Sequence, residues 1–125
     1  MPPSQAHELT LTVTRSPQES SGSPHVVALS GRLDASSQAA AERFLEELVA
    51  SGARRVVLDC SDLEFLSSAG VRAILILVKR LKPLNGAVSM SATRPHVRQL
   101  LEFSGLRALL AISSTVEEGC AALSR

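Results

Sequence analysis

Length and composition restrict the kind of protein that this sequence can encode. The chain has 125 residues, which suits one compact domain with a single hydrophobic core. Its content of 45% hydrophobic and 20% charged residues is ordinary for a globular protein and excludes a disordered or fibrous chain. Trp and Tyr are absent and the formal net charge is +1. We therefore expect no nucleic-acid partner, because the chain offers few rings to stack on bases and little excess positive charge.

The amino terminus and the apolar runs do not have the form of secretion or membrane signals. Met1–His7 has neither a basic region nor an apolar run, so we expect residues 1–7 to form a flexible tail. The longest strongly apolar stretch, Ala73–Val78, is far shorter than the roughly 20 residues that cross a bilayer. We expect a cytoplasmic protein with no membrane partner. Cys60 and Cys120 fit no metal-binding spacing, and we expect them to be buried, reduced thiols.

Two strands are expected in the first part of the chain. Strict alternation of apolar and polar residues over 8–14 predicts a strand with one solvated face. Residues 15–24 are rich in Ser, Pro and Gly and have no periodicity, which predicts a flexible loop. Val26–Ser30 is the second predicted strand, and Gly31 is expected to break it.

A first helix is expected after this strand and should continue to about Ala50, where Gly52 ends it. Asp34, Ser36 or Ser37 can cap its amino terminus. Three apolar side chains should share its buried face while the charged residues between them point away; the three are Phe44, Leu45 and Leu48.

The middle of the chain predicts a buried strand followed by a helix. Arg55–Cys60 contains three consecutive apolar residues, the pattern of a central strand that is covered on both faces. A turn is expected over 61–66, and a second helix from Ser68 or Ala69 to Leu81.

The last third continues the alternation of strands and helices. A short strand is predicted over 88–91 and a last strand over 109–112. Between them Pro95 suits the first turn of a third helix and Gly105 suits its end. The apolar side of that helix is expected to comprise Val97, Leu100, Leu101 and Phe103. Thr115 and Glu118 have the spacing of a capping box, which predicts a fourth helix carrying Val116, Cys120 and Leu123.

The expected order is β, β, α, β, α, β, α, β, α, without an internal repeat. We therefore expect one α/β domain over 8–125, a mixed sheet of four to five strands packed with about four helices.

Three segments of the sequence together resemble the STAS domain family, in its anti-sigma factor antagonist type. Leu58–Val71 (LDCSDLEFLSSAGV) is similar to the family's Leu-Asp-x-Ser strand end and the Asp-Ser-[Ser/Thr/Ala]-Gly turn that follows it. Gly31–Asp34 (GRLD) resembles the family's Gly-Glu-Leu-Asp segment. Val97–Leu106 (VRQLLEFSGL) resembles its third helix and the Gly-Leu pair after it.

The resemblance implies a protein-binding switch rather than an enzyme, without a cofactor or metal. Ser68 stands where the family carries its phosphate-accepting hydroxyl. The implied partners are an anti-sigma factor serine kinase of the histidine-kinase-like ATPase fold and a serine phosphatase. Unphosphorylated, such a domain binds the kinase and so releases a sigma factor.

Elementary electrostatics also favours a modifiable hydroxyl at Ser68. A phosphate in the first turn of a helix faces free backbone amides and the positive end of the helix dipole, so the fold would tolerate it. The alternative is that Ser67 and Ser68 merely cap the helix. Ser67 also replaces the aspartate that the family has before its phosphoserine, so it is a second candidate acceptor, and Arg32 replaces the family's glutamate.

A partner-binding surface is expected around this serine. Its predicted members besides Ser68 are Asp34, Ser67, Ala69, Gly70, Arg72 and Ile76. Helical spacing predicts that Ile76 is exposed among cations, two turns after Ser68; it could equally be an isolated surface aliphatic residue.

Other functions fit the sequence less well. A hydrolase would need a nucleophile and a base within reach, and no Gly-x-Ser-x-Gly elbow is present. Asp59 and Asp62 suggest a metal, but nothing in the sequence completes an oxygen cage, and a strand end with a turn explains them. The main alternative is a constitutive binding module of the same fold, such as a stressosome-type scaffold subunit or the STAS subunit of a lipid-transporting ABC complex.

Overall fold

The computed structural model describes residues 8–16 and 24–123. Over these residues the chain forms five strands and four α-helices in the order expected from the sequence. The strands are β1 (Thr10–Arg15), β2 (His25–Leu33), β3 (Arg55–Leu66), β4 (Ala87–Ser91) and β5 (Ala111–Ser113). The helices are α1 (Gln38–Ala50), α2 (Ser68–Leu81), α3 (Pro95–Ser104) and α4 (Val116–Leu123), with short 3-10 helices η2 (Lys82–Leu84) and η3 (Leu106–Ala108). The predicted tail over 1–7 and most of the predicted loop over 15–24 lie outside the described residues.

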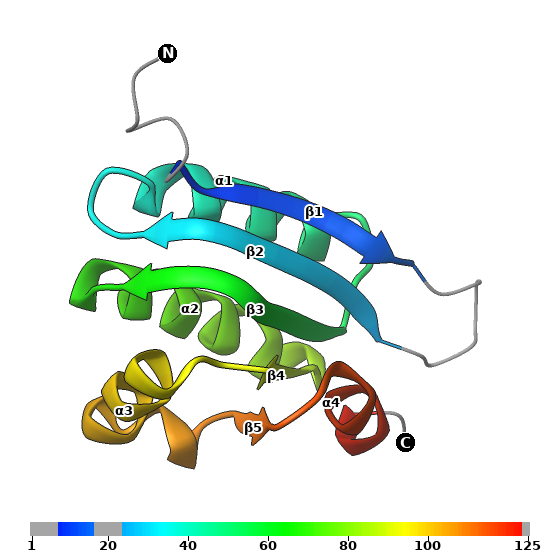
Figure 1. The fold of residues 1–125 in the computed structure, drawn as a ribbon. Helices are drawn as coiled ribbons and strands as arrows, with labels where there is room; N and C mark the ends of the chain where they lie inside the picture. Colours follow the sequence, from blue (N-terminus) through cyan, green and yellow to red (C-terminus); the bar gives the residue numbers. More distant parts are fainter. Residues whose placement is uncertain (1–7, 17–23, 124–125) are drawn as a thin grey trace.

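The strands form one mixed sheet in the order β1-β2-β3-β4-β5, so β3 is central, as its apolar run predicted. β1 is antiparallel to β2, and the other neighbours are parallel. Because parallel strands end at the same edge of a sheet, the loop after β2 and the starts of α2 and α3 meet at one edge, on the left of Figure 1.

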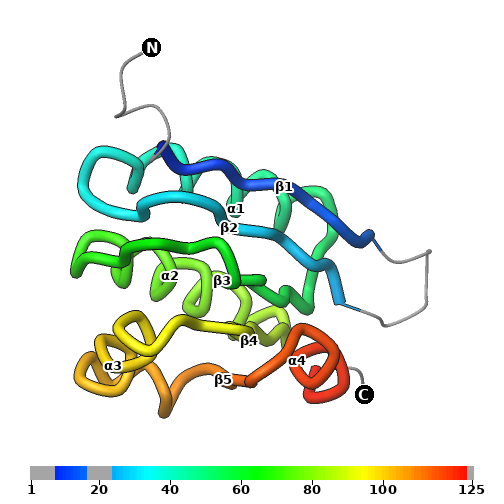
Figure 2. The backbone as a smooth tube through the Cα atoms, viewed as in Figure 1, coloured from blue at the N-terminus to red at the C-terminus, as the bar shows by residue number. Residues whose placement is uncertain are grey.

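The two faces of the sheet are covered unequally. Successive residues of a strand point to opposite faces, and Val56 and Val57 of β3 belong to different hydrophobic clusters. Val56 packs in the large cluster formed with α1, α2 and α3, whereas Val57 packs with Val26 of β2 and with α4. Figures 1 and 2 show α1 and α2 together on one side of the sheet and α4 as a separate helix at its lower right.

Two strands are longer than the sequence suggested. β2 continues through Gly31, which was expected to end it, and β3 continues through 61–66, which was expected to be a turn. The pairing of these strands shifts twice, between Ala28 and Ser30 and between Gly31 and Arg32. Gly31 has φ 100°, a conformation that glycine adopts without strain, so the strand absorbs the irregularity instead of stopping.

The amino-terminal strand also departs in detail from its expected form. β1 includes Arg15, which had been assigned to the loop. Leu9 and Leu11 pack against the core as the alternation predicted, but Val13 is 36% exposed.

The helices agree closely with their predicted positions. α2 begins at Ser68, Pro95 is the first residue of α3, and Gly105 follows α3 with φ 79°. On α1, Leu45 is buried and Phe44 and Leu48 pack against the core, as predicted. Five residues of α2 are buried, namely Gly70, Ala73, Ile74, Leu77 and Leu81.

Two side chains occupy different environments from those predicted. Phe103 was expected on the apolar side of α3 but is 83% exposed, because Val97 and Leu101, four residues apart, already form the buried side. Ile76 was expected to be exposed but is half-buried, where it lines a small cleft with Glu42 and Leu45 of α1.

The last helix and the cysteines agree with the sequence analysis. Thr115 Oγ1 accepts a hydrogen bond from the Glu118 amide at 3.1 Å, the main contact of the predicted capping box. The Glu118 carboxylate accepts from the amide of Ser114 at 3.2 Å, one residue earlier than the usual box. Cys60 and Cys120 are both free and buried, as predicted. No helix in the described ranges is both long and apolar enough to cross a bilayer.

Candidate functional site

The candidate site lies at the sheet edge where β2 and β3 end side by side. Leu33 and Leu66 are the last paired residues of the two strands. The amide of Ser67 then donates a hydrogen bond to the Leu33 carbonyl at 3.0 Å. This bond holds the turn between β3 and α2 against the end of β2.

Ser67 is the residue that caps α2. Its backbone is extended, with φ −101° and ψ 176°, and its side-chain oxygen accepts a hydrogen bond from the Gly70 amide at 3.4 Å. Its carbonyl accepts the amide of Val71 at 2.9 Å, the first bond of the helix. Ser67 is half-buried, so both its backbone and its side chain serve the fold.

Ser68 is the first residue of α2 and is exposed. Its hydroxyl makes no hydrogen bond within the described part of the chain. No acidic residue lies in the first turn of the helix, so the free amides and the positive end of the helix dipole have no negative side chain of α2 beside them. The capping alternative from the sequence therefore applies to Ser67 and not to Ser68.

Gly70 fixes how closely α2 approaches the strands. A Cβ atom on Gly70 would lie 2.5 Å from the Leu33 carbonyl oxygen and 2.6 Å from Leu66 Cδ1, which is too close for any larger residue. Gly70 is buried and the neighbouring Ala69 is half-buried. The tight packing positions Ser68 at the rim of the sheet edge.

A network of short hydrogen bonds orders the loop between β2 and α1. Asp34 Oδ1 accepts from the Ser36 hydroxyl at 2.6 Å and from the Ser36 amide at 3.0 Å. The Ser36 hydroxyl bond, with help from Arg32, holds the pKa of the Asp34 carboxyl below its ordinary value. Ser37 precedes α1 but makes no side-chain cap; its hydroxyl donates instead to the Arg32 carbonyl at 2.8 Å.

Arg32 joins this loop to β3. Its Nε lies 3.5 Å from Asp34 Oδ2, and its guanidinium lies 4.1 Å from the centroid of the Phe65 ring. Arg32 and Phe65 are paired across β2 and β3. The sequence alone does not predict this contact, because the contact depends on the shifted pairing of the two strands.

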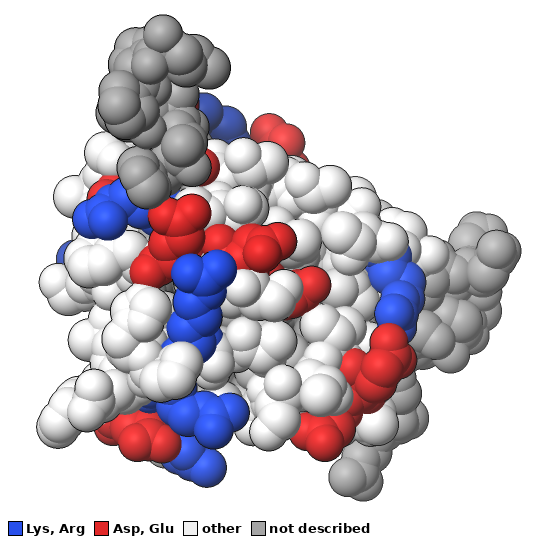
Figure 3. Space-filling model, in the orientation of Figure 1, with Lys and Arg blue, Asp and Glu red and all other residues white. Residues whose placement is uncertain are grey.

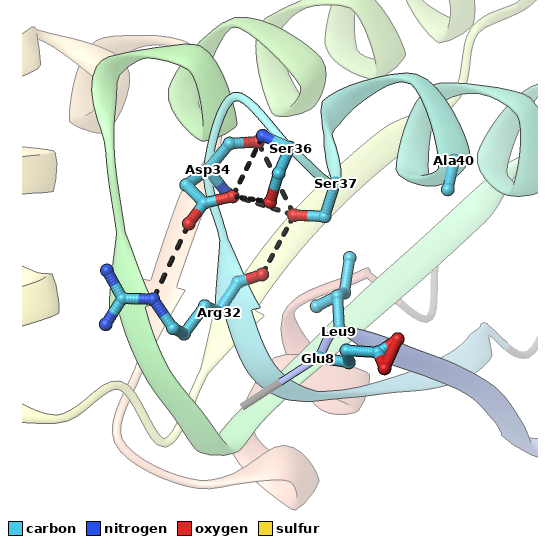
Figure 4. Close-up of a pocket in the computed structure, with 7 residues that line it drawn as sticks. All are labelled: Glu8, Leu9, Arg32, Asp34, Ser36, Ser37 and Ala40. Carbon is cyan, nitrogen blue, oxygen red and sulfur yellow. Dashed lines mark hydrogen bonds and ion pairs between the residues drawn. The ribbon is translucent and has the colours of Figure 1, made fainter. Parts of the chain in front are cut away.

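An open pocket of about 730 Å³ lies beside this network, between the start of β1 and the start of α1. Figure 4 shows that Arg32, Asp34, Ser36 and Ser37 lie along one side of the pocket and Glu8 and Leu9 along another. Its charged groups carry both signs, and Arg32 and Asp34 are already paired with each other. The pocket therefore has the character of a recess in a binding surface rather than of an anion or cation site.

The remaining predicted members of the surface are distributed along α2. Arg72 is exposed and lies one helical turn after Ser68, on the same side of the helix. Ile76, one turn further, faces the cleft with α1. Figure 3 shows acidic and basic side chains interspersed on the face viewed there, without an extended patch of one sign. The described residues contain no cluster of His, Cys, Asp and Glu suited to a metal ion, and Asp59 instead accepts from the Ser61 amide and hydroxyl.

Comparison with known proteins gives a family match over most of the sequence. The model of the family described as "STAS domain" matches residues 17–119. The curated protein named "Putative anti-sigma factor antagonist BtrV", from Bordetella bronchiseptica, is 33% identical over 97 residues. That alignment covers 78% of this chain and 84% of BtrV.

Solved structures share the arrangement of strands and helices. An anti-sigma factor antagonist from Mycobacterium paratuberculosis has a TM-score of 0.78 at 23% identity, covering 93% of this chain and 96% of that one. SpoIIAA in its unphosphorylated form has a TM-score of 0.70 at 23% identity, covering 89% and 91%. Bacillus SpoIIAA in its phosphorylated form has a TM-score of 0.65 at 22% identity, covering 92% and 98%. At these identities the likeness establishes a common fold.

Proposed function

Because the chain belongs to the STAS domain family, and within it to the anti-sigma factor antagonists, we propose that it is a protein-binding switch controlled by phosphorylation of Ser68. The observation that carries this proposal is the exposed hydroxyl at the first position of α2, which the fold does not use. A group can be added there without breaking a hydrogen bond of the domain. The solved forms of SpoIIAA, one phosphorylated and one not, are of a protein with the same fold.

The partner that we propose is an anti-sigma factor that is also a serine kinase of the histidine-kinase-like ATPase fold. It transfers the γ-phosphoryl group of ATP to Ser68 Oγ, so the new O–P bond replaces the bond to ADP and the hydroxyl proton is released. A serine phosphatase reverses the modification by hydrolysis. In the unphosphorylated state the domain holds the kinase, and a sigma factor is free to act in the cytoplasm.

Electrostatics explains how one modification ends the association. A phosphate brings about 1.5 to 2 negative charges and three strong acceptors to a position that was uncharged. The helix amides and Arg72 stabilise these charges within the domain, whereas a docked partner would have to strip them of water. Phosphorylation therefore leaves the fold intact but prevents the partner from docking.

The proposed docking surface surrounds Ser68 at the sheet edge. Asp34 and Arg72 supply the polar rim, and Ser67 and Ala69 form the turn itself. Gly70 contributes by close packing, since it is buried. Ile76 is half-buried beside α1, so it can contribute only its exposed part.

Ser68 rather than Ser67 is the proposed acceptor. Phosphate on Ser67 would have to displace the cap that Ser67 provides to the Gly70 amide. Phosphate on Ser68 disturbs no bond within the described ranges.

Incubation with the cognate kinase and Mg-ATP, followed by mass spectrometry, tests the proposal. We expect one phosphate on Ser68, lasting kinase binding by Ser68→Ala, and binding weakened at least tenfold by Ser68→Asp. Ser67→Ala is the matched control and should still be phosphorylated. An unmodified Ser68, together with equal binding by parent, Ser68→Ala and Ser68→Asp, would instead indicate a constitutive binding module such as a scaffold or transporter subunit.

A further inference from the structure

A second hollow lies at the opposite end of α2 from Ser68. It is a groove of about 490 Å³ between the end of α2, the starts of β4 and β5, and η3. The residues that form its apolar floor include Val78, Val88, Leu109, Leu110 and Leu123. Helix α2 has 14 residues, so the groove lies about 20 Å from Ser68.

The floor of the groove is incompletely covered by the protein itself. Leu109 is 51% exposed although it lies between the buried residues Leu106 and Leu110. An exposed leucine at the edge of a hollow with an apolar floor is typical of a surface that receives apolar side chains from another molecule.

The charges at the groove have one sign. Lys82 and Arg107 line it, and no acidic residue does. Both are exposed, as is Lys79 one turn before Lys82. Arg107 pairs with Glu102 at 3.0 Å, but neither lysine has an ion pair in the part of the chain that the structure describes.

The local sequence adds to this imbalance. Residues 79–82, at the end of α2, include three basic residues and no acidic one. Arg80 pairs with Glu46 of α1, whereas Lys82 lines the groove and Lys79 lies one turn before it, so these two lysines supply the positive charge. A ligand therefore binds here more tightly if it has negative charges at its edges and aliphatic side chains in its centre.

We propose that this groove binds an acidic segment of a partner protein that presents aliphatic side chains. The aliphatic side chains fill the floor between α2 and β5, and the carboxylates pair with Lys82 and Arg107. The distance from Ser68 keeps this contact independent of phosphorylation. If the Ser68 proposal is correct, this contact holds a partner near the domain in both the phosphorylated and the unphosphorylated state. If it is wrong, the groove still binds the acidic segment.

Selection from a library of random 12-residue peptides tests the chemistry of this ligand. The intact protein is the target, and the best peptides are then measured by fluorescence anisotropy. We expect enrichment of Asp and Glu together with Leu, Ile or Val, and a Kd that rises at least tenfold in the Lys82→Glu/Arg107→Glu variant. Leu109→Ser, which keeps the charges, should also weaken binding, whereas Arg43→Glu on the exposed side of α1 should leave it unchanged.

Other outcomes would overturn the proposal. These are the absence of any enriched peptide, enrichment of basic or aromatic peptides, and acidic peptides that bind the double variant as well as the parent. Concentration-dependent dimers that disappear in the double variant would mean that a second copy of the chain occupies the groove. Ser68→Asp should bind the selected peptides with unchanged Kd, so loss of peptide binding in this variant would contradict the independence of the two surfaces.

Discussion

Ser67 and Ser68 are adjacent serines whose side chains have different roles. Both are serines at the start of α2, yet Ser67 is half-buried and accepts the Gly70 amide, whereas Ser68 is exposed. A hydroxyl that caps a helix cannot be modified without cost to the fold, and one that makes no bond can. Under the proposed function, the two residues therefore separate stability from regulation.

Alanine substitution of each serine should reveal this division. We expect Ser67→Ala to lower the free energy of unfolding by about 0.5–2 kcal/mol, because the Gly70 amide loses its acceptor. Ser68→Ala should change it by less than about 0.5 kcal/mol, as is usual for exposed positions without contacts. Urea denaturation followed by circular dichroism measures both values. Equal losses in the two variants would show that Ser68 also supports the helix.

The sequence predicted the place of Ser68 better than its surroundings. Its position at the first turn of a helix follows from the Ser-Ser-Ala-Gly pattern and the apolar run that comes after it. The contact of Arg32 with Phe65 could not be foreseen, because it requires the pairing of two strands to be known residue by residue. The order of the Asp34 loop, where Ser37 bonds back to Arg32 rather than capping α1, was not predicted either, because Asp34, Ser36 and Ser37 all suit a helix cap and the sequence does not choose among them.

At the scale of elements, α4 packs on the sheet through a contact without a side chain. Gly119 is buried, and a Cβ atom there would collide with Ser91 Oγ and lie 2.9 Å from Ser89 Oγ. Ser89 and Ser91 are fully buried on β4, and their hydroxyls lie 3.4 Å apart. The helix therefore packs directly over a pair of small polar residues.

Gly119→Ala should destabilise the domain by about 1–3 kcal/mol, since the added methyl group forces α4 away from β4. Combining it with Ser91→Ala, which removes the nearer hydroxyl, should recover part of the loss. The two changes should thus couple by about 0.5–3 kcal/mol in a double-mutant cycle of urea unfolding. Additive losses would indicate that α4 shifts without meeting Ser91.

Helices were predicted more accurately than strands, for a physical reason. Helix ends depend on local signals such as Pro95 before α3 and Gly105 after it, and these signals are legible in the sequence. Strand ends depend on partners that are distant in sequence, so β2 and β3 were both expected to stop early. Phe103 was misassigned because apolar character alone does not tell which side of α3 faces the core.

At the scale of the whole molecule, Cys60 reports on the integrity of the central strand. It is completely buried in β3, and burial raises the pKa of its thiol from 9.0 to about 12, with the nearby Asp59 carboxylate adding to the rise. The unfolded chain releases this proton at lower pH than the folded one. The Cys60 thiol therefore leaves the free energy of unfolding unchanged well below pH 9 and lowers it as the pH rises from 9 toward 12.

Between pH 9 and pH 10 we expect Cys60 alone to lower the free energy of unfolding with a slope approaching about 1.4 kcal/mol per pH unit, the value for one proton. Cys60→Ala should remove this contribution and leave the part due to Cys120, whose thiol pKa burial also raises, although the substitution lowers stability at neutral pH by leaving a small cavity. Urea titrations of both proteins at several pH values measure the difference. A parent curve that stays parallel to that of Cys60→Ala would contradict the assignment.

The two shifts in pairing between β2 and β3 have a consequence for how this chain can change in length. The inward side chains of β3 step by two from Leu58 to Cys60 and then by three to Leu63 and to Leu66. Each step of three contains one extra residue of β3, so removing that residue leaves a step of two and keeps Leu63 and Leu66 inward. Removing a residue where the inward side chains already step by two, as between Leu58 and Cys60, would leave a step of one and turn the later side chains toward the opposite face, with the start of α2 behind them. Variants shortened within 60–66 should therefore keep this edge of the sheet, whereas variants shortened within 56–60 should not.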